Sequence, residues 1–311
     1  MRRIILLFGV LALVGGLSAC GGGETRAGKE HLRVGYQRFG GQSLLKAKGS
    51  APDATWSLFE SGPALTEALK AGAIDIGQTG EAPPIFAAAG GAKFKIIATS
   101  RPVPKGEAVL VKEKSGFTSF KDLKGKKVAL NKGSNVNWLL VKLLEANGMK
   151  ITDIEVQYLK PAEARPAFDN DQVDAWIIWD PYFSLAERPG VKVLADATGL
   201  ANNREYLLAS PEILKNRPDA VRAYLKVYRE VTDWGIAHPE ERVKLLAPEL
   251  KIPEDVARRA LARSAQPLAP VDATVGEELQ QIADGFTGLA LIPAKVDVTS
   301  LIDPSFLDIL Q

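Results

Sequence analysis

Cysteine and histidine are scarce in this chain of 311 residues. It has one cysteine, Cys20, and two histidines, His31 and His238. A single cysteine cannot form an internal disulfide, and these residues offer neither a cysteine–histidine catalytic pair nor a histidine metal cluster. Carboxylates are plentiful but form no recognisable general acid–base arrangement. We therefore expect no enzyme, no cofactor and no metal site.

The chain also lacks a surplus of either charge. It has 39 basic and 37 acidic residues, and the first twenty residues include two of the basic residues and no acidic one. The rest is electrically balanced, which excludes the strongly basic field of a nucleic-acid binder. A second hydrophobic run of membrane-spanning length is missing as well. Any anion site must therefore be built from local dipoles and a few polar groups.

The N-terminus carries an export signal. Arg2 and Arg3 precede an apolar run over residues 4–14, which is too short to span a membrane comfortably, and small residues lead to Cys20. The end of this segment resembles the lipobox of bacterial lipoproteins; the alternative is a plain signal peptide with an incidental cysteine. We expect residues 1–20 to be a lipoprotein signal peptide, Cys20 to be lipidated and residues 21–30 to be a flexible tether. The protein would then be extracytoplasmic, in the periplasm or on the outer face of the cytoplasmic membrane, and held there by its lipid.

Short apolar strands alternate with helical stretches from residue 32 onward, which predicts an α/β fold. The helices include one that begins near Pro63 and ends near Gly72, and another after residue 135 whose leucines share one face. Strands are expected at residues 32–36, 73–80, 94–100, 107–113, 154–159, 174–180, 191–196 and 206–210, and a further short strand begins at residue 128 and precedes the turn at residues 133–135.

Small, polar or aromatic residues follow four of these strands, at residues 36–37, 79–81, 133–135 and 179–180. In open α/β sheets ligands bind beyond the carboxyl ends of the strands, so these positions could converge in one cleft. The turn Gly133-Ser134-Asn135 would open a helix, whose free N–H groups and dipole favour an oxyanion. The alternative is that Ser134 or Asn135 is an ordinary N-cap that faces water.

Four stretches carry a resemblance to a known family: LRVGYQ, GPALTEALKAGAIDIGQTGEAPPIFAAAGG, DLKGKKVALNKGSNVNWLL and VDAWIIWDPY. Together they resemble the solute-binding proteins of ABC importers for aliphatic sulfonates, a group that includes taurine, nitrate and thiamine-precursor binders. The resemblance covers roughly residues 32–300. It implies a two-lobed periplasmic-binding-protein-like fold (type II), with two crossovers and the ligand cleft between the lobes. Residues 31–112 with 205–311 would form the first lobe, and residues 113–204 the second.

The resemblance also implies partners and site residues. The partners would be a small sulfonate anion and an ABC permease in the cytoplasmic membrane with its ATPase, and the protein would be a monomer. In the first lobe, Gln37 would donate its amide to the ligand, and Thr79 and Gly80 would offer hydroxyl and backbone N–H groups. Glu81 would lie beside them or merely stabilise a helix start.

In the second lobe, the resemblance assigns further donors to Gly133, Ser134 and Asn135. Trp179 would cover the aliphatic part of the solute, or else pack in the core. Asp180 would face the far end of the solute or fix the hydrogen-bond network around the site. The alternative is that Asp180 only stabilises the turn that precedes Pro181.

A sulfonate suits such neutral donors, since it stays ionised at physiological pH and needs no buried counter-ion. The expected function is capture of alkanesulfonates for import as a sulfur source. Taurine, whose ammonium Asp180 could balance, nitrate and a thiamine-precursor pyrimidine stay open as ligands. An enzyme of the pyrimidine-synthase type is the rival class.

Overall fold

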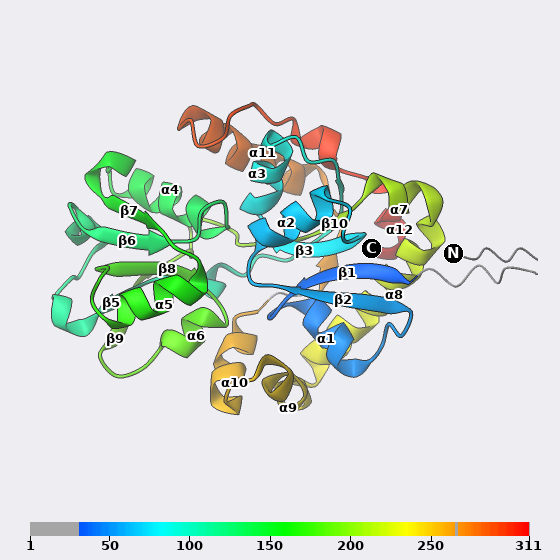
Figure 1. Ribbon diagram of the computed structural model, residues 1–311, viewed down its shortest axis with the longest axis horizontal. Helices are drawn as coiled ribbons and strands as arrows, with labels where there is room; N and C mark the ends of the chain where they lie inside the picture. Colours follow the sequence, from blue (N-terminus) through cyan, green and yellow to red (C-terminus); the bar gives the residue numbers. More distant parts are fainter. Residues whose placement is uncertain (1–30, 265–266, 311) are drawn as a thin grey trace, which may run out of the picture. The chain divides into compact units, whose positions relative to one another are not determined.

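Two β-sheets organise the chain in the computed structural model, which describes residues 31–264 and 267–310 (Figure 1). The predicted signal peptide, Cys20 and the tether lie outside the described residues. The first sheet has six strands in the order β11-β4-β10-β3-β1-β2. Their bounds are β1 Leu32–Gln37, β2 Ala54–Phe59, β3 Ile76–Gly80, β4 Lys95–Ser100, β10 Glu205–Ala209 and β11 Leu268–Ala269.

The second sheet has five strands in the order β7-β6-β8-β5-β9. Their bounds are β5 Glu107–Lys112, β6 Lys127–Leu130, β7 Glu155–Tyr158, β8 Ala175–Trp179 and β9 Val191–Asp196. In both sheets parallel pairs adjoin a strand that runs the other way, β10 in the first and β5 in the second. The chain is thus α/β, as predicted.

Strand β5 corrects the predicted boundary between the lobes. The prediction places residues up to 112 in the first lobe, yet β5 pairs with β8 and β9 of the second sheet. Its sequence, EAVLVK, is a buried apolar strand that fits either sheet, so its pattern alone could not assign it. We name the first sheet with its helices the first lobe, and the second sheet with its helices the second lobe.

Helices cover both faces of the first sheet (Figure 1). Leu65, Ile85 and Leu279 belong to one hydrophobic cluster, whereas Leu45 and Val221 belong to another. The helices of the first cluster are α2 (Gly62–Lys70), α3 (Ala82–Ala89) and α11 (Ala273–Gly288), and those of the second include α1 (Gly41–Lys48), α8 (Pro218–Ala237), α9 (Pro239–Leu250) and α10 (Glu254–Ala262).

The second sheet alternates its buried side chains between two helical layers. Ile177 faces the cluster that contains α4 (Val136–Ala146), and its neighbour Trp176 packs against Phe168 of α5 (Pro161–Asp169). The short helix α6 (Tyr182–Ala186) joins α5 on that side. Successive residues of a strand point to opposite faces, so one apolar strand supplies both cores.

Two chain segments join the lobes, residues 101–106 and 197–204, which we call the first and second crossovers. The backbone N–H of Val103 donates to the carbonyl of Asn202 at 2.9 Å, and the side-chain amide of Asn203 donates to the carbonyl of Val103 at 3.0 Å. The two crossovers are therefore bonded to each other. The lobes also meet away from them, where Trp138 of α4 packs edge-on against Phe286 of α11.

Smaller elements complete the described chain. They are α7 (Pro211–Asn216), α12 (Leu307–Leu310) and the 3-10 turns Pro104–Gly106, Glu113–Ser115, Phe120–Leu123, Ile151–Asp153, Val298–Leu301 and Pro304–Phe306. Among the described residues, no helix has the length and apolar character needed to cross a membrane.

Candidate functional site

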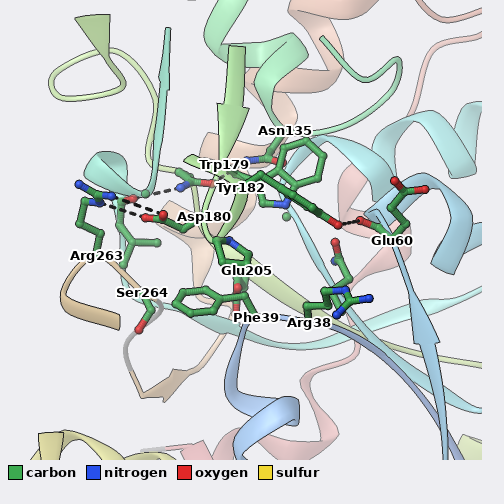
Figure 2. Close-up of a pocket in the computed structure, with 16 residues that line it drawn as sticks. Arg38, Phe39, Glu60, Asn135, Trp179, Asp180, Tyr182, Glu205, Arg263 and Ser264 are labelled. Atoms are coloured by element: carbon green, nitrogen blue, oxygen red, sulfur yellow. Dashed lines mark hydrogen bonds and ion pairs between the residues drawn. The ribbon is translucent and has the colours of Figure 1, made fainter. Parts of the chain in front are cut away.

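A cavity lies where the two lobes and both crossovers meet (Figure 2). Its empty space, including the part open to solvent, is about 610 Å³. Its lining comes from the first lobe (Gln37, Arg38, Phe39, Glu60, Gly80, Glu205, Arg263, Ser264), the second lobe (Asn135, Trp179, Asp180, Pro181, Tyr182) and the crossovers (Val103, Gly106, Asn203).

The predicted convergence of strand ends is confirmed. Gln37 ends β1, Gly80 ends β3 and Trp179 ends β8, and all three line the cavity together with Asn135 and Asp180. These five residues come from widely separated parts of the sequence. The structure brings them together because both sheets direct these strand ends toward the crossovers.

Gln37 is held in place on both sides. The side-chain amide of Gln37 donates to the backbone carbonyl of Gln78 at 3.1 Å, and the backbone carbonyl of Gln37 accepts the hydroxyl of Ser43 at 2.7 Å. One amide hydrogen is therefore engaged within the first lobe, and Gln37 lines the cavity. This geometry is compatible with the donor role predicted for Gln37.

Gly80 and Asn135 form a close contact between the lobes. A Cβ on Gly80 would lie only 3.0 Å from the Cβ of Asn135, so only a glycine fits there without displacement. The amide nitrogen of Asn135 donates to Oε2 of Glu107 at 2.6 Å and to Oδ1 of Asn203 at 2.8 Å. Both amide hydrogens of Asn135 are thus used within the protein, so its side-chain nitrogen has no hydrogen left for a ligand.

Gly133 and Ser134 are not part of the cavity lining. The hydroxyl of Ser134 donates to the carbonyl of Asn131 at 2.7 Å, and the N–H of Gly133 donates to Oδ1 of Asn137 at 2.5 Å. These donors stabilise the turn that precedes α4. Their predicted contact with a ligand stays a prediction, and it would require these internal bonds to be given up.

Thr79 and Glu81 are buried behind Gly80 and do not line this cavity. A Cβ on Gly62 would come within 2.2 Å of the Thr79 hydroxyl oxygen, so that hydroxyl faces the start of α2. Glu81 precedes α3 without capping it through its side chain, and its Oε2 accepts the backbone N–H of Arg204 at 3.2 Å. Burial raises the pKa of Glu81 to about 7.

Asp180 is bonded to the other lobe. Nε of Arg263 lies 3.0 Å from its Oδ2, and the hydroxyl of Ser184 donates to its Oδ1 at 2.6 Å. Arg263 also binds Glu187 at 2.8 Å. Burial raises the pKa of Asp180, although Arg263 opposes the shift. Two ligand-related roles were predicted for Asp180: to face the far end of the solute, or to fix the hydrogen-bond network around the site. This geometry matches the second role.

Aromatic rings line another part of the cavity (Figure 2). The rings of Trp179 and Tyr182 meet edge to face with centroids 5.9 Å apart, and Phe39 belongs to the same lining. Trp179 also packs against the hydrophobic clusters on both faces of the second sheet. It therefore combines core packing with an exposed apolar surface, and the two interpretations of Trp179 do not exclude each other.

Glu205 was not singled out by the sequence. Its side chain accepts the amide of Gln78, which in turn accepts the hydroxyl of Tyr228 at 2.9 Å. Burial raises the pKa of Glu205 to about 8, so this carboxyl is mostly neutral at pH 7. Its one sequence signal is its place ahead of the apolar strand YLLA. Arg263 was missed too, because a cation at a helix end is common on surfaces.

The charges around the cavity nearly cancel. The lining contains two cations, Arg38 and Arg263. Its acidic groups are Glu60, Asp180 and Glu205, and the carboxyl of Glu205 is largely neutral. Among the described residues, no group of three or more His, Cys, Asp or Glu side chains is placed to hold a metal ion. The arrangement can enclose a small solute with directed polar groups on one side and aromatic rings on another.

Comparison with known proteins gives consistent matches. Residues 59–242 match the family model described as NMT1/THI5 like. The chain is 38% identical to a protein of Escherichia coli (strain K12) named as an aliphatic sulfonates-binding protein, over 96% of this chain and 95% of that protein. A Bacillus subtilis (strain 168) protein of the same name is 32% identical over 98% and 96% of the two chains. The alkanesulfonate-binding protein SsuA of Xanthomonas axonopodis pv. citri, solved with bound MOPS, superposes with a TM-score of 0.82 at 35% identity, over 88% of this chain and 98% of that one.

Proposed function

Because the chain belongs to the NMT1/THI5-like family, among the aliphatic sulfonate-binding proteins, we propose that it captures aliphatic sulfonates in the cavity between its lobes. It is a binding protein and not an enzyme. It would act as a monomer outside the cytoplasmic membrane and deliver the solute to an ABC permease with its ATPase. Lipidation of Cys20 and use of the sulfonate as a sulfur source belong to the same proposal.

The convergence of donors from both lobes carries this proposal. Gln37 and Gly80 of the first lobe and Asn135, which precedes α4 of the second lobe, all line the cavity. The second amide hydrogen of Gln37 and the backbone N–H groups of Gly80 and Asn135 would donate to the ligand. A sulfonate shares one charge over three oxygens, and each hydrogen bond to a charged group contributes about 1.5–3 kcal/mol. Neutral donors from two lobes therefore suffice to bind it and to draw the lobes together.

The aromatic lining suits an apolar tail. Trp179, Tyr182 and Phe39 offer ring surfaces but no charge. Asp180 is already paired with Arg263, so it is a poor counter-ion for the ammonium of taurine. The structure therefore favours alkanesulfonates over taurine as the preferred solute.

Titration calorimetry tests the proposal with ethanesulfonate, taurine, nitrate, sulfate and an aminopyrimidine. We expect micromolar or tighter binding of ethanesulfonate and no heat from nitrate or sulfate. Binding of nitrate or of the pyrimidine without any sulfonate would keep the fold and refute the substrate.

A matched pair of variants locates the site. Gln37→Glu replaces a donor by a carboxylate of the same shape and should abolish sulfonate binding. Gln172→Glu adds the same charge on an exposed surface and should bind as the parent does. Equal affinities for the two variants would place the anion elsewhere.

A further inference from the structure

A buried polar cluster joins both lobes and both crossovers directly behind the cavity. It contains Glu81 of the first lobe, Glu107 and Asn135 of the second lobe, and Asn203 of the second crossover. All four are at most 8% exposed. Through Asn203, which donates to the carbonyl of Val103, the cluster reaches the first crossover as well. Any hinge motion of the lobes must rearrange these groups.

Asn135 connects this cluster to the cavity. It lines the cavity, and its amide nitrogen donates to Oε2 of Glu107 at 2.6 Å. Glu107 is fully buried at the first residue of β5, in the same lobe as Asn135. Its carboxyl therefore fixes the side chain that packs against Gly80 across the lobes.

Two carboxyl oxygens in the cluster lack a donor. Within the described part of the chain, Oε1 of Glu81 and Oε1 of Glu107 are buried without a hydrogen-bond partner. Leaving two ionised carboxylates buried in this way is costly, whereas a proton on one of them supplies the missing donor.

The charged surroundings do not neutralise the pair. Burial raises the pKa of Glu107, and the charge of Glu81 raises it further, so the two carboxyls interact. Arg204 lowers the pKa of Glu81, but its guanidinium is bonded to Glu278 at 2.8 Å. Burial raises the pKa of the Tyr206 phenol, and the charge of Glu81 raises it further.

We propose that Glu81 and Glu107 hold a proton between them when the lobes are closed, and that Glu107 positions Asn135, so that sulfonate binding takes up a proton. This inference rests on the proposed function. The pair would make closure of the lobes, and thus release of the solute, sensitive to the pH outside the cytoplasmic membrane.

The sign of the effect follows from the two states. In open lobes water reaches the carboxyls, and their pKa returns toward the ordinary 4.5; in closed lobes the pKa of Glu81 is about 7 and that of Glu107 is also raised. Closure is therefore most favourable below pH 4.5 and loses free energy as the pH rises through 7. For each proton taken up, affinity falls up to about tenfold per pH unit in this window.

The test measures ethanesulfonate affinity of the full chain at pH 5.5, 6.5 and 7.5, in a Glu205→Gln background that removes a cavity carboxyl whose pKa burial raises to about 8. We expect affinity to fall at least tenfold over this range, with close to one proton taken up per ligand in calorimetry with buffers of different ionisation enthalpy. Adding Glu81→Gln, whose amide N–H replaces the carboxylic O–H, should reduce both effects severalfold. An unchanged pH profile and proton uptake in that variant would overturn the proposal.

Glu107 needs a variant pair, because a purely structural role would also lower affinity. Glu107→Gln can still accept from Asn135 and should bind with a flattened pH profile, whereas Glu107→Leu should bind weakly at every pH. A pH profile in Glu107→Gln that equals that of the parent would contradict the shared proton.

Infrared difference spectroscopy separates this inference from the proposed function. In the Glu205→Gln background at pH 7, a carboxylic-acid C=O band that appears when ethanesulfonate binds, and is missing when Glu81→Gln and Glu107→Gln are combined, would support the pair. Tight binding without such a band would refute the pair and leave the proposed function intact, whereas failure to bind any sulfonate would refute the proposed function itself.

Discussion

Arg263, after α10 of the first lobe, binds Asp180, at the end of β8 in the second, with Nε 3.0 Å from Oδ2. The guanidinium also lies 3.9 Å from the ring centre of Phe183 and binds Glu187. Since Asp180 and Arg263 both line the cavity, this ion pair joins the lobes at the wall that encloses the solute.

Loss of this ion pair should destabilise the protein. The side chain of Asp180 is 3% exposed, so Arg263→Met would leave a buried carboxylate short of its charged donor. We expect a loss of about 1.5–3 kcal/mol in unfolding free energy, measured by urea denaturation.

Arg258→Met is the matched control, because Arg258 binds Glu240 where both side chains are about half exposed. Water replaces such a pair at little cost, so the unfolding curve of this variant should overlay that of the parent. Equal losses in the two variants would show that the Arg263–Asp180 pair contributes nothing specific.

A methyl group at Gly80 should weaken sulfonate binding. The Cβ of Gly80→Ala would meet Asn135 at 3.0 Å, so the start of α4 must move away from the first lobe. Calorimetry should show about tenfold weaker binding, in line with the 1–3 kcal/mol typical of overpacking. Gly288→Ala is the control, since a Cβ there meets open space at the end of α11. Unchanged affinity of Gly80→Ala would mean that the close approach of the lobes at this point is not needed.

Ionisation of Glu205 should oppose anion binding. Its pKa is raised to about 8 by burial, so the wall of the cavity gains a negative charge as the pH rises through 8. In a Glu81→Gln background, affinity for ethanesulfonate should fall about tenfold between pH 7 and 9.5, and Glu205→Gln should remove this fall.

The same shift affects stability with a known sign. The pKa of Glu205 is higher in the folded chain than the ordinary 4.5. Its contribution to the free energy of unfolding is therefore complete below pH 4.5 and is lost as the pH rises through 8. The unfolding free energy should therefore decrease toward alkaline pH, and less so in Glu205→Gln. A stability that rises from pH 6 to 9 by an amount that Glu205→Gln removes would contradict the assignment.

The sequence predicted the frame of the site better than its chemistry. Gln37, Gly80 and Trp179 lie at the strand ends where we expected them, because each ends a buried strand with a clear apolar pattern. Their contact with a ligand stays a prediction. Strand β2 was missed because it lies at the edge of its sheet, where exposed residues such as Leu58 interrupt that pattern.

Side-chain pairing across the lobes could not be predicted in the same way. Within the second lobe, the sequence predicted Ser134 as a ligand donor because a helix start exposes N–H groups, but it could not show that the hydroxyl of Ser134 donates to the carbonyl of Asn131. Arg263 and Asp180 are far apart in sequence, and only the folded lobes make them partners. Burial, which sets the protonation of Glu205, likewise depends on contacts between distant segments.

Trp179 should set the preference for tail length. Its ring offers the cavity an apolar face beside Tyr182, and burial of each methylene contributes about 0.8 kcal/mol at most. The parent should therefore bind pentanesulfonate more tightly than methanesulfonate, and Trp179→Ala should lose most of this difference. Trp234→Ala removes an indole of α8 that does not line the cavity, so this variant should keep the affinity difference between the two sulfonates. If Trp179→Ala weakened all sulfonates equally, Trp179 would act through the core of the second lobe, and tail selection would lie with Phe39 and Tyr182.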